Sequence, residues 1–243
     1  MRVAFALAAF VLLAGPAAAQ TVSADLSSHL IAITTGFTGT EVTLFGATDG
    51  GADVIAVVRG PEQEIVVRRK SRVFGIWMNT RRITFTAVPS FYAVYSSRPL
   101  AEIATPGLQA LHQIGLENLR FAALEEGAPI EIADFRGALL AEQQRTGRFG
   151  KEVGHIAFLG DRLFRATIAF PATVPVGPYL VEVFLVRNKG VVSGQTTPLV
   201  VSQVGLDADV YDFAQRRALA YGILAVVVAV VAGWLASLPF RNA

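Results

Sequence analysis

A dense group of basic side chains is the first feature of this sequence that could do chemistry. Six basic residues and one tryptophan lie close together: Arg68, Arg69, Lys70, Arg72, Trp77, Arg81 and Arg82. Guanidinium groups donate paired hydrogen bonds to carboxylate and phosphate oxygens, so this cluster could hold a small anion or meet anionic headgroups. The interpretation that we favour from sequence is a solvated edge strand whose charges deter pairing with another sheet.

No other residues have the spacing of a catalytic or metal site. His29, His112 and His155 are the only histidines, and each lies in a different segment without a carboxylate at ligand spacing. Gly36–Thr40 lacks the Lys-Ser/Thr pair of a phosphate-binding loop. No Gly-x-Ser-x-Gly motif and no cysteine occurs. We therefore expect no enzyme activity, no cofactor and no metal, and a core that holds without disulfides.

The two ends of the chain predict how it is placed in the cell. Residues 1–19 combine Arg2, an apolar run and a final Ala-Ala-Ala, which predicts a signal peptide. Without them 20 basic and 19 acidic side chains remain, because Arg2 is the only charge removed from 21 and 19. This near-neutral balance gives no reason to expect nucleic acid as a partner.

Residues 219–238 predict one transmembrane helix, because this stretch of twenty residues carries no charge. Tyr221 and Trp234 lie near its ends, where amphipathic rings favour the headgroup level. A helical linker over 206–218 would precede it and a cytoplasmic tail at 239–243 would follow. We expect a single-pass protein of the bacterial inner membrane, with the bulk of the chain in the periplasm. Two arginines before the span and one after it mildly oppose this orientation, and we expect export through the signal to override them.

Small residues recur along one face of the predicted span, at steps of three or four: Gly222, Ala225, Ala229 and Gly233. Such a face lets helix backbones approach closely in lipid. It predicts packing against an integral membrane partner, such as a transporter, or against a second copy of the span. An Ala/Val-rich sequence can also produce such a stripe by chance.

The exported region, residues 20–205, has the pattern of a mainly β domain. Short runs rich in β-branched residues alternate with turn residues: Leu30–Thr35, Glu41–Phe45, Val54–Val58, Glu64–Arg68 and Ile83–Ala87. Further runs occur at 153–159, 163–170, 175–186, 191–192 and 198–202. This spacing predicts an immunoglobulin-like β-sandwich.

A helical insertion is expected between about residues 100 and 150. Helical patterns cover 107–114 and 130–145. In the second, Ile132, Phe135, Leu139 and Leu140 lie on one helix face, and Gly147 is a plausible end.

Four phrases resemble one known family: Gly36–Gly46, Val66–Asn79, Pro89–Ser97 and Tyr221–Leu224. It is the alphaproteobacterial "putative transmembrane protein" family, with a signal, an exported domain and one C-terminal span. The resemblance implies an inner-membrane protein whose relatives are often encoded near sulfite-exporter-type permeases. We therefore expect a non-enzymatic, membrane-anchored periplasmic accessory or interaction protein of an inner-membrane complex. The alternative is a periplasmic module that binds a small anion through residues 68–82.

Overall fold

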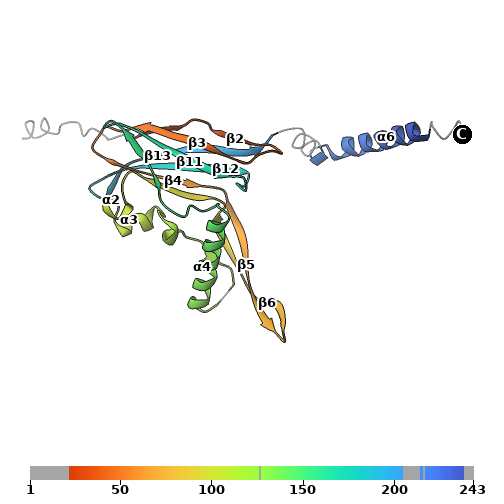
Figure 1. Cartoon of the computed structure of the whole chain (residues 1–243), viewed down its shortest axis with the longest axis horizontal. Coiled ribbons are helices and arrows are strands. Elements are labelled where there is room, and N and C mark those ends of the chain that lie inside the picture. Colours follow the sequence, from red (N-terminus) through yellow and green to blue (C-terminus); the bar gives the residue numbers. More distant parts are fainter. Residues whose placement is uncertain (1–21, 126, 205–213, 216, 238–243) are drawn as a thin grey trace, which may run out of the picture.

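The computed structural model describes residues 22–125, 127–204, 214–215 and 217–237. The predicted signal peptide, the predicted tail and most of the predicted linker lie outside these residues. The described body is mainly β, as the sequence predicted, with its helices gathered on one side (Figure 1).

Two sheets lie face to face in this body. The first sheet has four strands in the order β1 (Ser23–Leu26), β3 (Gly39–Ala47), β11 (Leu163–Pro171) and β10 (Ala157–Leu159). The second has six, in the order β2 (Leu30–Ile33), β13 (Gly190–Gln203), β12 (Gly177–Arg187), β4 (Asp53–Arg59), β7 (Tyr92–Ser96) and β9 (Gly154–His155). Their pairings are antiparallel except β2 with β13 and β7 with β9.

Alternate residues of both sheets fill the core between them. In β11 the inward residues Phe164, Ala166, Ile168 and Phe170 are buried, while the residues that alternate with them, Arg165, Thr167 and Ala169, are exposed. This period of two follows from the pleat of a strand. Tyr179, near the start of β12, is fully buried and donates its hydroxyl hydrogen bond to the Pro175 carbonyl oxygen at 2.7 Å.

The second sheet is also covered on its other face. In β4, Val54, Ala56 and Val58 face the first sheet, whereas Ile55 and Val57 belong to a second core. Burial on both faces explains why β4 is a continuous apolar run in the sequence. The second core is covered by α2 (Leu100–Ile103), α3 (Pro106–Leu111), the 3₁₀ turn η1 (Leu116–Asn118) and α4 (Pro129–Arg145).

Helix α4 presents the face that its sequence predicted. Phe135 and Leu139 are buried in the second core, and Ile132 and Leu140 pack against it. The helix ends at Arg145, and Gly147 takes a φ of 74° that favours glycine. The apolar periodicity of α4 therefore predicted correctly which of its faces packs against the second core.

Several strands differ from the sequence-based expectation. The run at 153–159 is divided between β9 and β10 in different sheets, because Ile156 between them is buried in the first core. The runs at 191–192 and 198–202 form one strand, β13. Gly194 lies within this strand, and a Cβ there would lie 3.4 Å from Phe184 Cδ1, in van der Waals contact with that ring.

The C-terminal helix α6 spans Ala218–Ser237. Within the described part of the chain, where the side chains of α6 are included only as far as Trp234, no helix is long and apolar enough to cross a membrane. The span expected at 219–238 therefore has no support from the structure.

Candidate interaction surface on the β5–β6 hairpin

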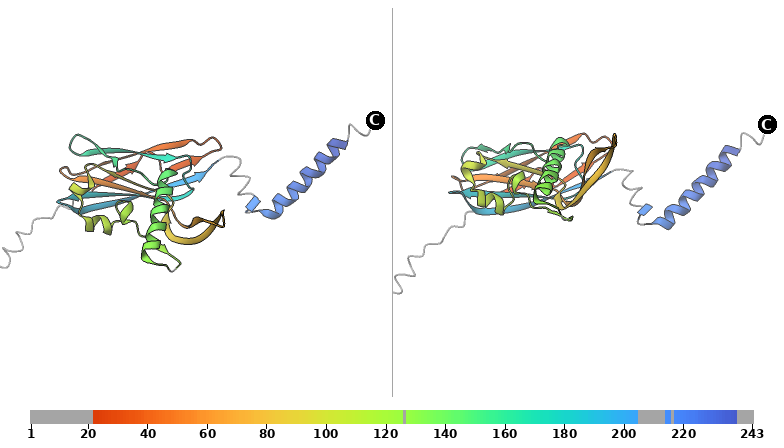
Figure 2. Two further views of the ribbon diagram at one scale, coloured as in Figure 1. Left: turned by 60° about the horizontal axis from the view of Figure 1, so that its bottom comes forward. Right: turned by 90° about the horizontal axis from the view of Figure 1, so that it is seen from below.

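A long hairpin leaves the body and carries all seven basic-cluster residues. It consists of β5 (Glu62–Val73) and β6 (Ile76–Pro89), and β8 (Ala122–Ala123) pairs with its base. At the base, Ile83 and Phe85 are buried in the second core. The rest extends away from the sandwich beside α4 (Figures 1 and 2). The sequence predicted only the short strands Glu64–Arg68 and Ile83–Ala87, so the projection was missed.

Two of the basic residues hold the hairpin against α4. Arg81 makes two hydrogen bonds to Glu131, Nε to Oε1 at 2.9 Å and Nη2 to Oε2 at 3.1 Å. Arg69 Nη2 lies 3.4 Å from Asp134 Oδ2, and its guanidinium carbon lies 4.7 Å from the ring centroid of Phe135. Arg69 and Arg81 therefore act within the fold.

The other four basic residues form the cationic face of the hairpin: Arg68, Lys70, Arg72 and Arg82. Strand alternation places the first three on the side of β5 that points away from Arg69, and the register sets Arg82 opposite Arg68. Among the described residues, no carboxylate oxygen lies within 4.0 Å of any of them. Like charges directly opposite each other destabilise a strand pair, so local folding does not explain this arrangement.

Arg82 has one weaker electrostatic neighbour, Glu125. The pKa of Glu125 is lowered, first by the hydrogen bond from the Thr84 backbone N–H and least by the charge of Arg82. Glu125 also accepts the Thr84 hydroxyl at 2.9 Å. This carboxylate therefore serves mainly to hold the segment after β8 against β6.

The hairpin ends in an apolar tip, residues 73–78. Phe74 is 102% exposed, Trp77 69%, Ile76 67% and Met78 52%. Trp77 lies opposite Arg72 on the cationic face, while Ile76 and Met78 alternate with it and lie on the other face. The tip is thus apolar on both faces.

The backbone conformation of the turn at the tip is unfavourable for one of its two residues, Phe74. Phe74 and Gly75 connect the strands with φ angles of 49° and 85°. Two residues of positive φ make the turn that twisted hairpins prefer, and Asn-Gly or Asp-Gly usually supplies it. A bulky residue is a conformational outlier there. The site predicted from the sequence did not include Phe74, Ile76 or Met78. A signal for the hairpin was present, because the basic pairs 68/69 and 81/82 are equally spaced about Gly75.

The comparison with known families covers both the hairpin and the C-terminal helix. Residues 21–242 match a family model described as "Putative transmembrane protein (Alph_Pro_TM)". The chain belongs to this family. The resemblance seen in the sequence is therefore confirmed over nearly the whole chain. A search of curated proteins found no match.

In this Alph_Pro_TM chain the four small residues of the predicted span lie on α6. Gly222, Ala225, Ala229 and Gly233 are all exposed. Apart from the neighbouring residues and backbone of α6 itself, no atom of the described residues lies within 4 Å of a Cβ built on Gly222 or Gly233. The structure therefore does not bring these residues together with the hairpin.

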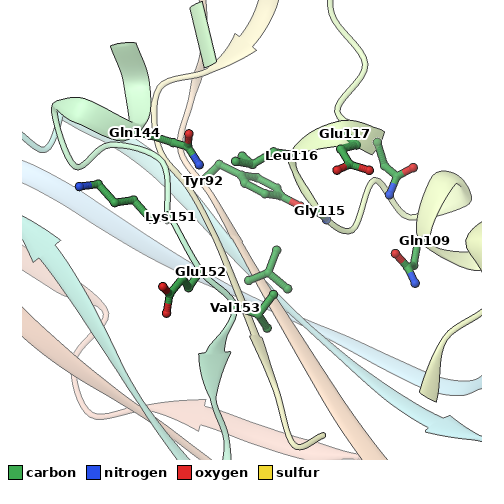
Figure 3. A pocket seen from close by; sticks show the side chains of 12 residues that line it. Tyr92, Gln109, Gly115, Leu116, Glu117, Gln144, Lys151, Glu152 and Val153 are labelled. Atoms are coloured by element: carbon green, nitrogen blue, oxygen red, sulfur yellow. Dashed lines mark hydrogen bonds between the residues drawn. The ribbon is translucent and has the colours of Figure 1, made fainter. Parts of the chain in front are cut away.

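A cavity of about 380 Å³ lies between the helical layer and the second sheet of the Alph_Pro_TM domain (Figure 3). Its lining includes Tyr92, Gln109, Glu117, Lys151 and Glu152. The Tyr92 hydroxyl donates to the Gln113 carbonyl at 2.7 Å and accepts from the Gly115 N–H at 2.8 Å. Burial raises the pKa of Tyr92 to about 12, so this hydroxyl is a fixed structural group at neutral pH. None of the basic-cluster residues lines this cavity.

The histidines are also separated in the fold. His29 pairs with exposed Asp25 at 2.9 Å, and the His112 ring lies 4.7 Å from that of Phe184. In the described part of the chain, no three His, Cys, Asp or Glu side chains are arranged to hold a metal ion. The hairpin combines exposed apolar and basic side chains that the contacts of the described residues do not explain.

Proposed function

We propose that this chain is a non-enzymatic interaction protein, anchored in the bacterial inner membrane as an accessory to an integral membrane complex such as a sulfite-exporter-type permease. The observation that carries this proposal is the β5–β6 hairpin, with its exposed apolar tip and a cationic face that has no carboxylate within 4.0 Å among the described residues. A projecting apolar surface rimmed by charge marks a contact site for another molecule. The aromatic and arginine side chains on it are the types enriched where binding energy concentrates.

The proposed anchor is the uncharged stretch 219–238. It overlaps helix α6, whose 20 residues would be about 30 Å long at about 1.5 Å per residue. The family description as transmembrane supports this assignment. With a signal peptide at 1–19, the body would lie in the periplasm and the C-terminus in the cytoplasm.

We also infer that the sandwich is immunoglobulin-like. The strand orders β1-β3-β11-β10 and β13-β12-β4 correspond to the ABED and GFC sheets of that fold. The hydrogen bond from the Tyr179 hydroxyl to Pro175 is like the tyrosine corner at the start of strand F. This fold hosts many functions, so the interaction role depends on the hairpin.

The small-anion alternative has weaker support from the geometry. Arg69 and Arg81 already have carboxylate partners on α4. The remaining cations lie along a projecting hairpin, and none of them lines the cavity of about 380 Å³ beside Tyr92. A small anion would have to be held without an enclosing pocket.

Photo-crosslinking in living cells tests the proposal. A photoreactive amino acid in place of Met78 should form a covalent adduct with another component of the membrane, either a protein or a lipid. The matched control is Thr167, which is exposed on β11 of the first sheet. Equal yields from the two positions, or no adduct from Met78, would contradict a contact role for the hairpin.

A further inference from the structure

We infer that the molecule contacted by the hairpin tip is the surface of an anionic phospholipid bilayer. This inference rests on the proposed function, which gives the hairpin a contact role at the membrane. It goes further by assigning the chemistry of the partner: acyl chains for the tip and lipid phosphates for the cationic face.

The apolar residues of the tip point in more than one direction. Trp77 lies on the cationic face, and Ile76 and Met78 lie on the opposite face. A folded protein partner would cover one face and leave the other in water. A bilayer surrounds an inserted tip on all sides, so it accounts for apolar side chains on both faces.

The residue at the turn supports insertion rather than folding. Phe74 is fully exposed and has a φ of 49°, so neither packing nor backbone preference favours it there. Strain at such a residue is a reason to look for function. A phenylalanine at the most distant point of the hairpin is the first side chain to reach an apolar medium.

The charges lie at the right depth for lipid phosphates. A strand advances about 3.3 Å per residue, so Arg72 lies about 7 Å and Lys70 about 13 Å behind Phe74. Interfacial elements bury their apolar part about 5–10 Å into the headgroup and acyl boundary. With the tip at that depth, Trp77 and Arg72 lie among the headgroups, where tryptophan and arginine are both favoured.

The support of the hairpin matches this role. The Arg69 and Arg81 contacts with α4 hold the stem. The strand register shifts between Arg69 and Lys70, and the part of the hairpin from Lys70 to Asn79 extends beyond the contacts with α4. From Ile65 to Phe85 the hairpin has six basic residues and no acidic residue. A bilayer surface that contains anionic phospholipid therefore attracts the whole projecting part.

Quenching of Trp77 fluorescence by lipid tests this inference in the full chain. Trp234→Phe leaves Trp77 as the only tryptophan, since the sequence has two. The chain is reconstituted in lipid nanodiscs with brominated acyl chains, made of phosphatidylcholine alone or mixed with phosphatidylglycerol. We expect a blue-shifted Trp77 emission that is quenched more in the anionic discs than in the discs of phosphatidylcholine alone. Arg72→Glu with Arg82→Glu should remove the quenching.

In the control, the single tryptophan lies on the first sheet instead of the hairpin. This variant carries Thr167→Trp together with Trp77→Phe and Trp234→Phe, and its emission should not be quenched. Thermal unfolding of each variant verifies that the domain is folded. Trp77 quenching no greater than that of the control overturns lipid contact. If Met78 then still crosslinks to a protein, the proposed function stands and only the lipid assignment fails. If Met78 gives no adduct either, both fail.

Discussion

Arg69 and Arg81 lie directly opposite each other across the hairpin, and their guanidinium groups both reach acidic residues of α4. Two like charges in a cross-strand pair would repel each other. Glu131 and Asp134, one helical turn apart, neutralise them. The helical insertion and the hairpin are therefore linked by charge, although they are far apart in sequence.

Glu131→Gln should loosen this link without unfolding the domain. The pair is partly exposed, so we expect a loss of only about 0.5 kcal/mol in global stability. Amide exchange in residues 68–82 should rise more clearly. Glu142→Gln is the matched control, because Glu142 makes a bidentate pair with Arg145 within α4. Unchanged exchange in the hairpin would contradict the bracing role of Glu131.

Phe74→Asn should stabilise the isolated fold while weakening its contact. Asparagine tolerates the left-handed backbone, so we expect a gain of about 1 kcal/mol in unfolding free energy. Crosslinking from Met78 should fall at the same time. Gly75→Ala is the opposite control, because a side chain is strained at a φ of 85° and stability should fall. A destabilised Phe74→Asn variant would show that Phe74 packs within the fold.

Acid should weaken the attachment of β8 through Glu125. Its pKa is lowered from 4.5 in the folded chain, mainly by the Thr84 N–H. A lowered carboxyl pKa stabilises the fold above its unfolded value, and this contribution is lost as pH falls through the folded pKa. The wild type should therefore be more stable than Glu125→Gln at pH 7, and the difference should shrink below about pH 4.5. Denaturant unfolding at several pH values measures this; a constant difference would argue against it.

Reporter fusions test the proposed topology. A reporter active only in the periplasm should be active after Val204 and silent after Arg241. The expected reason is that stretch 219–238 stops transfer across the membrane. Mass spectrometry of the mature chain should show the loss of residues 1–19. Activity only after Arg241 would reverse the orientation.

Enlarging the small residues of α6 tests whether the proposed anchor has a helical partner. Ala225→Leu and Gly233→Leu should reduce recovery of a membrane partner or second copy from detergent, because close backbone contact is lost. Val226→Leu and Val230→Leu are the controls on the opposite face. If both pairs leave recovery unchanged while the protein still inserts, the small-residue stripe is coincidental.

The sequence predicted an element well where the burial of apolar side chains determines the spacing of residue types. Phe135 and Leu139 of α4 follow the helical period because they are buried in the second core. The hairpin was missed because its tip opposes local rules: Phe74 occupies a turn position that usually holds asparagine, and Arg68 faces Arg82. Such conflicts between local preference and structure are expected at functional sites. Strand β9 was also not predicted separately. It has only two residues, and its partner β7 lies before the long helical insertion in the sequence.

The parallel pairing of β2 with β13 has a mechanical consequence. β13 is the last strand of the body, and its final residues Val200–Gln203 lie beside Leu30–Ile33 while its earlier part is paired along β12. A pull on the chain beyond residue 204 acts along β13, so it loads these backbone hydrogen bonds in shear and many must break together. The antiparallel pair of β12 and β13, whose open end lies at Gly177 and Val201, lacks this protection if its two strands are pulled apart there. The pairing of β2 with β13 is therefore arranged to resist a pull applied to the chain beyond residue 204.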